Sequence, residues 1–112
     1  MSDHIRLNSD FLNLLLHTDT RQQRALLKTI TDWQTDALSE IFYNLAHVTP
    51  LNNEEKKRLK KHLRVIKSIA NIDRHRQQRK LGIKRKREQV IKILMIVRQS
   101  IADLISKTRP IA

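Results

Sequence analysis

Three carboxylates recur at every fourth position between residues 32 and 40: Asp32, Asp36 and Glu40. Because residues four apart share one face of an α-helix, the three side chains would form an acidic strip. Such a strip could bind a divalent metal ion for nuclease chemistry. The alternative is an exposed acidic strip, which could dock against basic helices of the same chain or of a second copy. We favour the exposed or docked strip, because no other pattern in the chain supports catalysis.

No other set of residues has the spacing of a catalytic or metal site. The chain has no cysteine, which excludes thiolate ligands and cysteine nucleophiles. Its single glycine excludes a glycine-rich phosphate loop. The histidines show neither metal-ligand spacing on one helix face nor a Ser-His-Asp arrangement: His4, His17, His47, His62 and His75. We therefore predict a protein that is not an enzyme, with no catalytic residue, metal, cofactor or small-molecule substrate.

The densest charge lies between Lys56 and Arg87, where fifteen Lys or Arg residues accompany a single acid, Asp73, and account for most of the net charge of +12. A surface with this much positive charge repels itself, and a polyanion would relieve the repulsion while releasing its condensed counterions. We therefore predict that nucleic acid is the partner. The residues expected to contact it are Lys56, Lys57, Lys60, Lys61, Arg64, Lys67, Arg74, Arg76, Arg79, Lys80, Lys84, Arg85, Lys86 and Arg87.

The composition of this basic block indicates how it would bind. It contains no Phe, Tyr or Trp, so it lacks aromatic platforms for unpaired bases. The chain also has no zinc-finger spacing and no aromatic RNA-recognition strand. We therefore expect contacts to the phosphate backbone without sequence preference, with duplex DNA favoured over RNA, in a coating, packaging or architectural role.

Three alternatives stay open at this stage. The basic face could bind an acidic protein, which would make the chain an adaptor or a particle-assembly protein. A helix-turn-helix could be present among the short helices, although no segment stands out as a recognition helix. The last helix could lie on an anionic membrane, but its charges precede its apolar part instead of lying opposite it.

The elements that position these residues are predicted to be helices. One Gly and two Pro in 112 residues are too few for the tight turns of a β-rich fold. We predict one all-α domain over residues 1–112, a bundle of five or six helices. Residues 10–48 form an acidic and apolar core half, 52–87 a basic helical segment, and 88–106 an apolar C-terminal helix. No stretch is long and apolar enough to span a bilayer.

Capping boxes indicate where helices begin. Thr20 with Gln23, Thr31 with Gln34, and Asn52 with Glu55 each have the required spacing. The first predicts a helix over 21–29, the second a helix from Asp32 to about His47, and the third a helix to about Ala70. An apolar cluster over 11–16 predicts a further short helix. Within these helices we expect Trp33 and Phe42 in the core, Tyr43 beside it, and one apolar seam made of Leu59, Leu63, Ile66 and Ala70.

The remaining boundaries are expected in the basic segment. Asn71 would end one helix, and Asp73 would cap a short basic helix over 74–81. Gly82, the only glycine, is expected to break the chain there. The last helix would then begin within 84–87 and run to about Ser106. Its broad apolar face, together with residues 11–16, exceeds what so small a domain easily buries, so we also expect a homodimer.

The middle of the chain resembles small basic proteins encoded by Polinton (Maverick) elements and related adenovirus-like viruses. The resemblance covers roughly residues 20–90 and is carried by Arg24-Ala25-Leu26-Leu27, Ile30-Thr31-Asp32, Ala37-Leu38-Ser39-Glu40-Ile41, Asn44, Pro50-Leu51, Glu55-Lys56-Lys57 and Leu59-Lys60. It implies a protein of a DNA element or virus, located inside the cell in the nucleus or in a viral particle. A role in genome packaging or DNA coating is implied as well, with no catalytic residues.

Overall fold

The computed structural model describes residues 3–108, and these form helices without a strand. The elements are α1 (Asp3–Leu7), α2 (Ser9–His17), α3 (Thr20–Lys28), α4 (Asp32–His47), α5 (Asn53–Leu59), the 3-10 turn η1 (Lys60–His62), α6 (Leu63–Ala70), α7 (Arg76–Arg85), α8 (Arg87–Ile96) and α9 (Arg98–Thr108). The predicted all-α class is confirmed. The predicted number of five or six helices is wrong, because α1 was not expected and two of the expected helices are divided.

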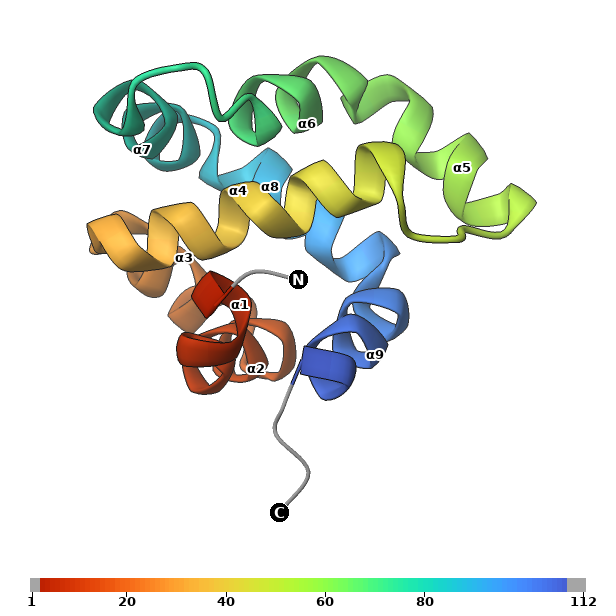
Figure 1. Cartoon of the computed structure of the whole chain (residues 1–112), viewed down its shortest axis with the longest axis horizontal. Coiled ribbons are helices and arrows are strands. Elements are labelled where there is room, and N and C mark those ends of the chain that lie inside the picture. The colour runs from red at the N-terminus through yellow and green to blue at the C-terminus, as the bar shows by residue number, and fades with distance from the viewer. Residues whose placement is uncertain (1–2, 109–112) are drawn as a thin grey trace.

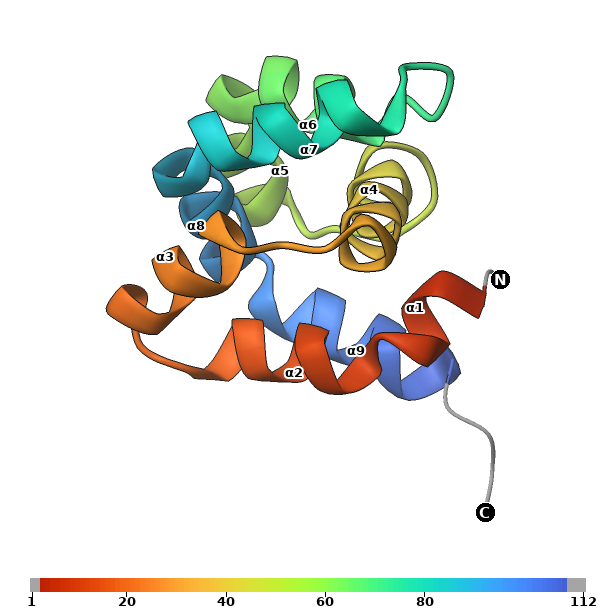
Figure 2. The same ribbon diagram turned by 90° about the vertical axis from the view of Figure 1, so that its left-hand side faces the viewer.

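Helix α4 runs through the middle of the molecule (Figure 1). Helices α5, α6 and α7 lie on one side of it, and α1, α2 and α9 lie on the other, as Figure 2 shows with α4 nearly end-on. α4 packs against α6 and α7 on the first side and against α1 on the second, while α8 packs against α3 and α5. The basic segment therefore occupies one side of α4.

Two of the three predicted capping boxes are confirmed. At the start of α4, the Thr31 hydroxyl accepts from the Gln34 amide at 3.1 Å, and the Gln34 side chain accepts from the Thr31 amide at 3.0 Å. At the start of α5, the Asn52 side chain accepts from the Glu55 amide at 2.7 Å, with the reciprocal bond at 3.1 Å. These bonds satisfy amides that have no partner within the helix.

The prediction of a third capping box, between Thr20 and Gln23, is wrong. Asp19 caps α3 instead, and its carboxylate accepts from the Gln22 amide at 2.8 Å. Gln23 is buried, and its side-chain amide donates to the carbonyl of Leu15 at 2.9 Å. The glutamine therefore joins α3 to α2, because a buried amide needs a partner more than an exposed helix end does.

The core extends to both sides of α4. Leu38, Ile41 and Phe42 of α4 are fully buried. The same hydrophobic cluster includes Ile66 and Ile69 of α6 and, from α1, α2 and α9, Ile5, Leu12, Leu15, Leu16, Ile101 and Ile105. Because α2 packs against α9, most of the apolar surface that suggested a dimer is covered within the chain. The homodimer stays a prediction without that support.

Trp33 was expected in the core, and this is wrong. It lies in the first turn of α4 with 62% of its surface exposed, and its ring lies 6.2 Å from that of His4. Phe42 is buried and Tyr43 is 43% exposed, as predicted. The buried face of α4 therefore passes through Thr35 in the first turn, and Trp33 lies outside that face.

Two of the predicted boundaries in the basic segment are confirmed, because α6 ends at Ala70 with Asn71 as its C-cap and α8 begins at Arg87. The cap at Asp73 and the break at Gly82 are wrong. α7 begins after His75, whose ring Nδ1 accepts from the Gln77 amide at 3.2 Å, so Asp73 does not cap it. Gly82 lies inside α7 without a positive φ. The breaks occur at Lys86 (φ −106°, ψ 27°) and Val97 (φ −115°, ψ 24°).

The single apolar C-terminal helix expected over 88–106 is therefore two helices. The break at Val97 lets α8 pack against α3 and α5 while α9 packs against α1 and α2. One straight helix could not bury so broad an apolar face against both groups. Within residues 3–108, no helix has the length and apolar character needed to cross a bilayer.

The position of Gly82 gives a stability prediction. A Cβ placed on Gly82 would meet no atom within 4 Å, and alanine favours a helix interior over glycine by about 0.5–1 kcal/mol. We expect Gly82→Ala to raise the free energy of unfolding by about that amount, as measured by urea denaturation. Ala25→Gly, at an exposed site in α3, is the matched control and should lower it similarly. Destabilisation by Gly82→Ala would show that the space is not open.

Candidate functional site

The segment α5–η1–α6 has a buried face and a basic face. Leu59, Ile66 and Ala70 are buried as predicted, but Leu63 is 41% exposed and His62 is buried in its place. The reason is η1, because a 3-10 turn has about 3.0 residues per turn and shifts the face that follows. The basic face carries exposed cations along the whole segment: Lys56, Lys57, Arg58, Lys60, Lys61, Arg64 and Lys67.

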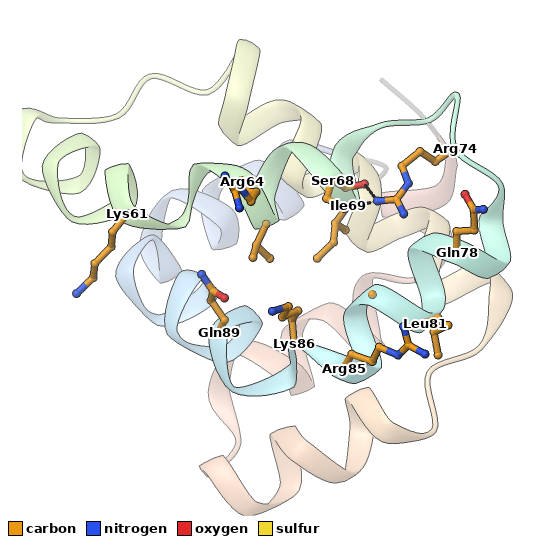
Figure 3. Close-up of a pocket in the computed structure, with 12 residues that line it drawn as sticks. Lys61, Arg64, Ser68, Ile69, Arg74, Gln78, Leu81, Arg85, Lys86 and Gln89 are labelled. Atoms are coloured by element: carbon orange, nitrogen blue, oxygen red, sulfur yellow. Dashed lines mark hydrogen bonds between the residues drawn. The ribbon is translucent and has the colours of Figure 1, made fainter.

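A groove of about 660 Å³ lies between α6 and α7 and extends to the start of α8 (Figure 3). Five cations line it, and no carboxylate does: Lys61, Arg64, Arg74, Arg85 and Lys86. Lys61 and Gln89 lie toward one end, and Arg74 and Gln78 lie toward the other. The groove therefore gathers predicted site residues from three separate elements and the loop before α7.

The floor and walls of the groove are not basic. Val65 and Ile69 of α6 and Leu81 and Gly82 of α7 contribute apolar surface. Leu81 is 45% exposed, which leaves its side chain accessible. Ser68, Gln78 and Gln89 add uncharged polar groups. The groove can thus offer charge, hydrogen bonds and apolar contact to one ligand.

Two groups at the ends of the groove are held in place. The Arg74 guanidinium donates to the hydroxyl of Ser68, and no carboxylate within residues 3–108 pairs with it, so its charge is not neutralised. At the other end the Gln89 amide lies 3.0 Å from Nδ1 of His62. Burial, with Lys61 and Lys92 nearby, lowers the pKa of His62, which favours its neutral form.

Three predicted site residues are engaged by the acidic strip. Arg76 pairs with Asp36 at 2.7 Å, and Lys80 pairs with Asp32 at 3.0 Å. Arg79 pairs with Asp36 at 3.2 Å and donates to the Ser39 hydroxyl at 2.6 Å. Asp32 and Asp36 of the strip therefore dock on the chain's own basic helix α7, which was one of the possibilities left open by the sequence.

The prediction that Arg79 belongs to the contact surface is corrected by the burial of its side chain. Its side chain is only 8% exposed, so it cannot reach a polymer in solution. Asp36 also bonds Arg76, and within residues 3–108 no group of three His, Asp or Glu side chains is placed to hold a metal ion. Asp32 and Asp36 accordingly belong to the α4–α7 contact.

The other eleven predicted contact residues form no ion pair within the described part of the chain. Lys84 and Arg87 are half-buried, and the Arg87 guanidinium donates to the carbonyl of Lys84 at 2.9 Å. Glu88, the acid that follows the block, is turned away and pairs with Arg24 of α3. A hydrogen bond from Arg24 lowers the pKa of Glu88. The groove therefore keeps its positive charge.

Sequence reasoning predicted Arg85 but missed the uncharged groove residues Gln78, Leu81 and Gln89, which lie on the same side. Gln78, Leu81, Arg85 and Gln89 are spaced by three, four and four, so they lie along one side of α7 and the start of α8. That spacing was readable, but Gly82 was interpreted as a break and divided the stripe. Arg58 was also left out, although it is exposed beside Lys57.

The chain matches no protein-family model, no curated protein and no solved structure. The resemblance to proteins of Polinton elements and adenovirus-like viruses therefore stays a prediction from the residues quoted above.

The burial of Arg79 gives a second stability prediction. Removing one partner of a buried pair leaves a charge without compensation, at a cost of about 3–5 kcal/mol. We expect Asp36→Ala to lower the free energy of unfolding by about 3 kcal/mol in urea denaturation. Asp32→Ala is the control and should cost clearly less, because the Asp32 carboxylate is 40% exposed. Equal losses for the two variants would contradict a special role of Asp36.

The stability of the α4–α7 contact should depend on pH. A hydrogen bond from Lys80 lowers the pKa of Asp32. A lowered folded-state pKa stabilises the fold above the unfolded pKa, and this stabilisation is lost as pH falls through the folded pKa. We expect Asp32→Asn to be less stable than the parent near neutral pH. The difference should shrink below about pH 4 in denaturation curves over a pH series. A difference independent of pH would argue against the pair.

Proposed function

We propose that the protein binds the phosphate backbone of nucleic acid without sequence preference, and that double-stranded DNA is the preferred polymer. The observation that carries the proposal is the separation of the cations into two groups. Asp32 and Asp36 engage Arg76, Arg79 and Lys80. Nine of the other eleven predicted contact residues lie along α5–η1–α6 or line the groove, and the groove has no carboxylate among its lining residues. Charge left uncompensated on one side suits a polyanion.

The dimensions of the basic face suit a backbone. The segment from Asn53 to Ala70, at about 1.5 Å per residue, is about 27 Å long. Duplex DNA carries one negative charge per about 1.7 Å of its axis, so a face of this length lies beside many phosphates. Arg side chains can fork onto phosphate oxygens, and lysines supply point charges. Such contacts position a protein on DNA without reading bases.

A coating, packaging or architectural role follows from binding of this kind, and the resemblance to proteins of mobile elements and viruses would place it in the nucleus or in a particle. The competing function is an adaptor or particle-assembly protein that binds an acidic protein. Both functions need the same cations, so the choice between them depends on the polymer that binds more tightly.

Salt-dependent binding tests the proposal. We expect a fluorescently labelled random duplex to bind in anisotropy titrations, with a log–log slope against salt of about −0.9 per phosphate contact and about 6–10 contacts. Lys61→Glu combined with Arg64→Glu should weaken binding to all duplexes and reduce the slope by about 1 per residue. Arg21→Glu combined with Lys107→Glu makes the same charge change on α3 and α9 and should have a much smaller effect.

Three outcomes would count against the proposal. The first is absence of binding to any duplex at low salt. The second is equal loss of binding in the two double variants, because net charge alone would then explain it. The third is tighter binding to polyglutamate than to a duplex under the same conditions, which would favour the acidic protein partner.

A further inference from the structure

The groove between α6 and α7 has features that binding to a phosphate backbone does not require. A phosphate backbone is bound by cations on an open surface, whereas this groove has an apolar floor made by Val65 and Ile69 and an accessible Leu81. Its volume of about 660 Å³ falls within the range of about 300–1,000 Å³ that is usual for small-ligand sites. Such sites are mostly apolar, with a few polar groups that orient the ligand.

Gly82 keeps this groove open. Glycine in a helix interior is less favourable than alanine, and here neither a positive φ nor a close neighbour requires it. The fold itself therefore does not explain the glycine. Because Gly82 lines the groove, any larger side chain at this position would take up space that a ligand could use.

The groove also carries side chains that could stack on a nucleobase or form hydrogen bonds with it. It has no aromatic side chain, but unpaired bases also stack on the planes of arginine guanidinium groups. Arg64, Arg74 and Arg85 line the groove, and Ser68 already holds Arg74 in position. Gln78 and Gln89, from opposite ends (Figure 3), carry amides that can donate to and accept from a base edge.

The geometry points to a binding site for one unpaired nucleotide of the bound polymer. Its base would lie against Val65, Ile69 and Leu81 over Gly82, and its phosphate among the cations at the rim. This inference rests on the proposed function and deepens it, because it adds a preferred structure to a sequence-independent DNA binder. The preferred target is a duplex that already contains an unpaired nucleotide, since no base pair then has to be opened.

Two duplexes of equal length test the inference, one perfectly paired and one with a single bulged nucleotide. Burial of about 60 Å² of a base against the apolar side chains of the groove is enough to change affinity by roughly tenfold, so we expect about tenfold tighter binding of the bulged duplex in anisotropy titrations. Gly82→Leu, which fills the groove without changing charge, should abolish this preference, so that the bulged and the perfect duplex bind this variant with equal affinity. Gly82→Ala should retain most of the preference. Ala25→Leu, at an exposed site in α3, is the control for an added leucine.

A second measurement uses the parent protein alone. Because Gly82 is the only glycine, ¹⁵N-glycine labelling gives one amide signal in an NMR spectrum, and it reports on the groove. We expect saturation with the bulged duplex to move this signal to a position that saturation with the perfect duplex does not produce.

The outcomes separate the inference from the function on which it rests. Equal affinity for the two duplexes, with the same Gly82 signal position, would overturn the nucleotide site and leave backbone binding intact. Loss of the preference in Ala25→Leu as well as in Gly82→Leu would also overturn it. Failure of both duplexes to bind at low salt would instead overturn the proposed function itself.

Discussion

The buried pair of Arg79 and Asp36 joins helix α7, which carries part of the basic segment, to the central helix α4. The Arg79 guanidinium contacts the Asp36 carboxylate, the Ser39 hydroxyl and the carbonyl of Arg74. A buried charge is tolerated only when its hydrogen-bonding groups are satisfied in this way. Because Arg79 belongs to α7 and Asp36 to α4, the pair sets where α7 lies, and α7 forms one wall of the groove.

The same contact determines which positive charges are left uncompensated. The acids of α4 engage the cations on the near side of α7, whereas the side that carries Gln78, Leu81 and Arg85 faces the groove. One helix therefore serves both purposes, with a neutralised face that holds the fold and a charged face that can meet a ligand. Further exposed cations follow α5, η1 and α6, and these elements lie on the same side of α4 as α7 (Figure 1).

Local patterns were predictable where neighbouring residues decide the outcome. The Thr31 and Asn52 caps and the extent of α4 follow from bonds within three or four positions. Prediction failed where distant partners compete. Gln23 bonds the backbone of α2, and Trp33 stays exposed because the buried face of the first turn of α4 is the one that carries Thr35. Similarly, neither Lys86 nor Val97, where the helices break, is a glycine or a proline, so the sequence does not indicate these breaks. They allow the helices on either side to pack against separate groups of neighbours.

The sequence by itself determined the all-α class and the chemistry of the surface, because composition and helical spacing are local properties. It also placed a dense positive charge in one segment and an acidic strip in another. Only the tertiary structure decided which cations the strip engages, and that Gly82 lies open in a groove instead of ending a helix. Pairing and open space depend on which elements become neighbours, and that is settled by the packing of the whole core.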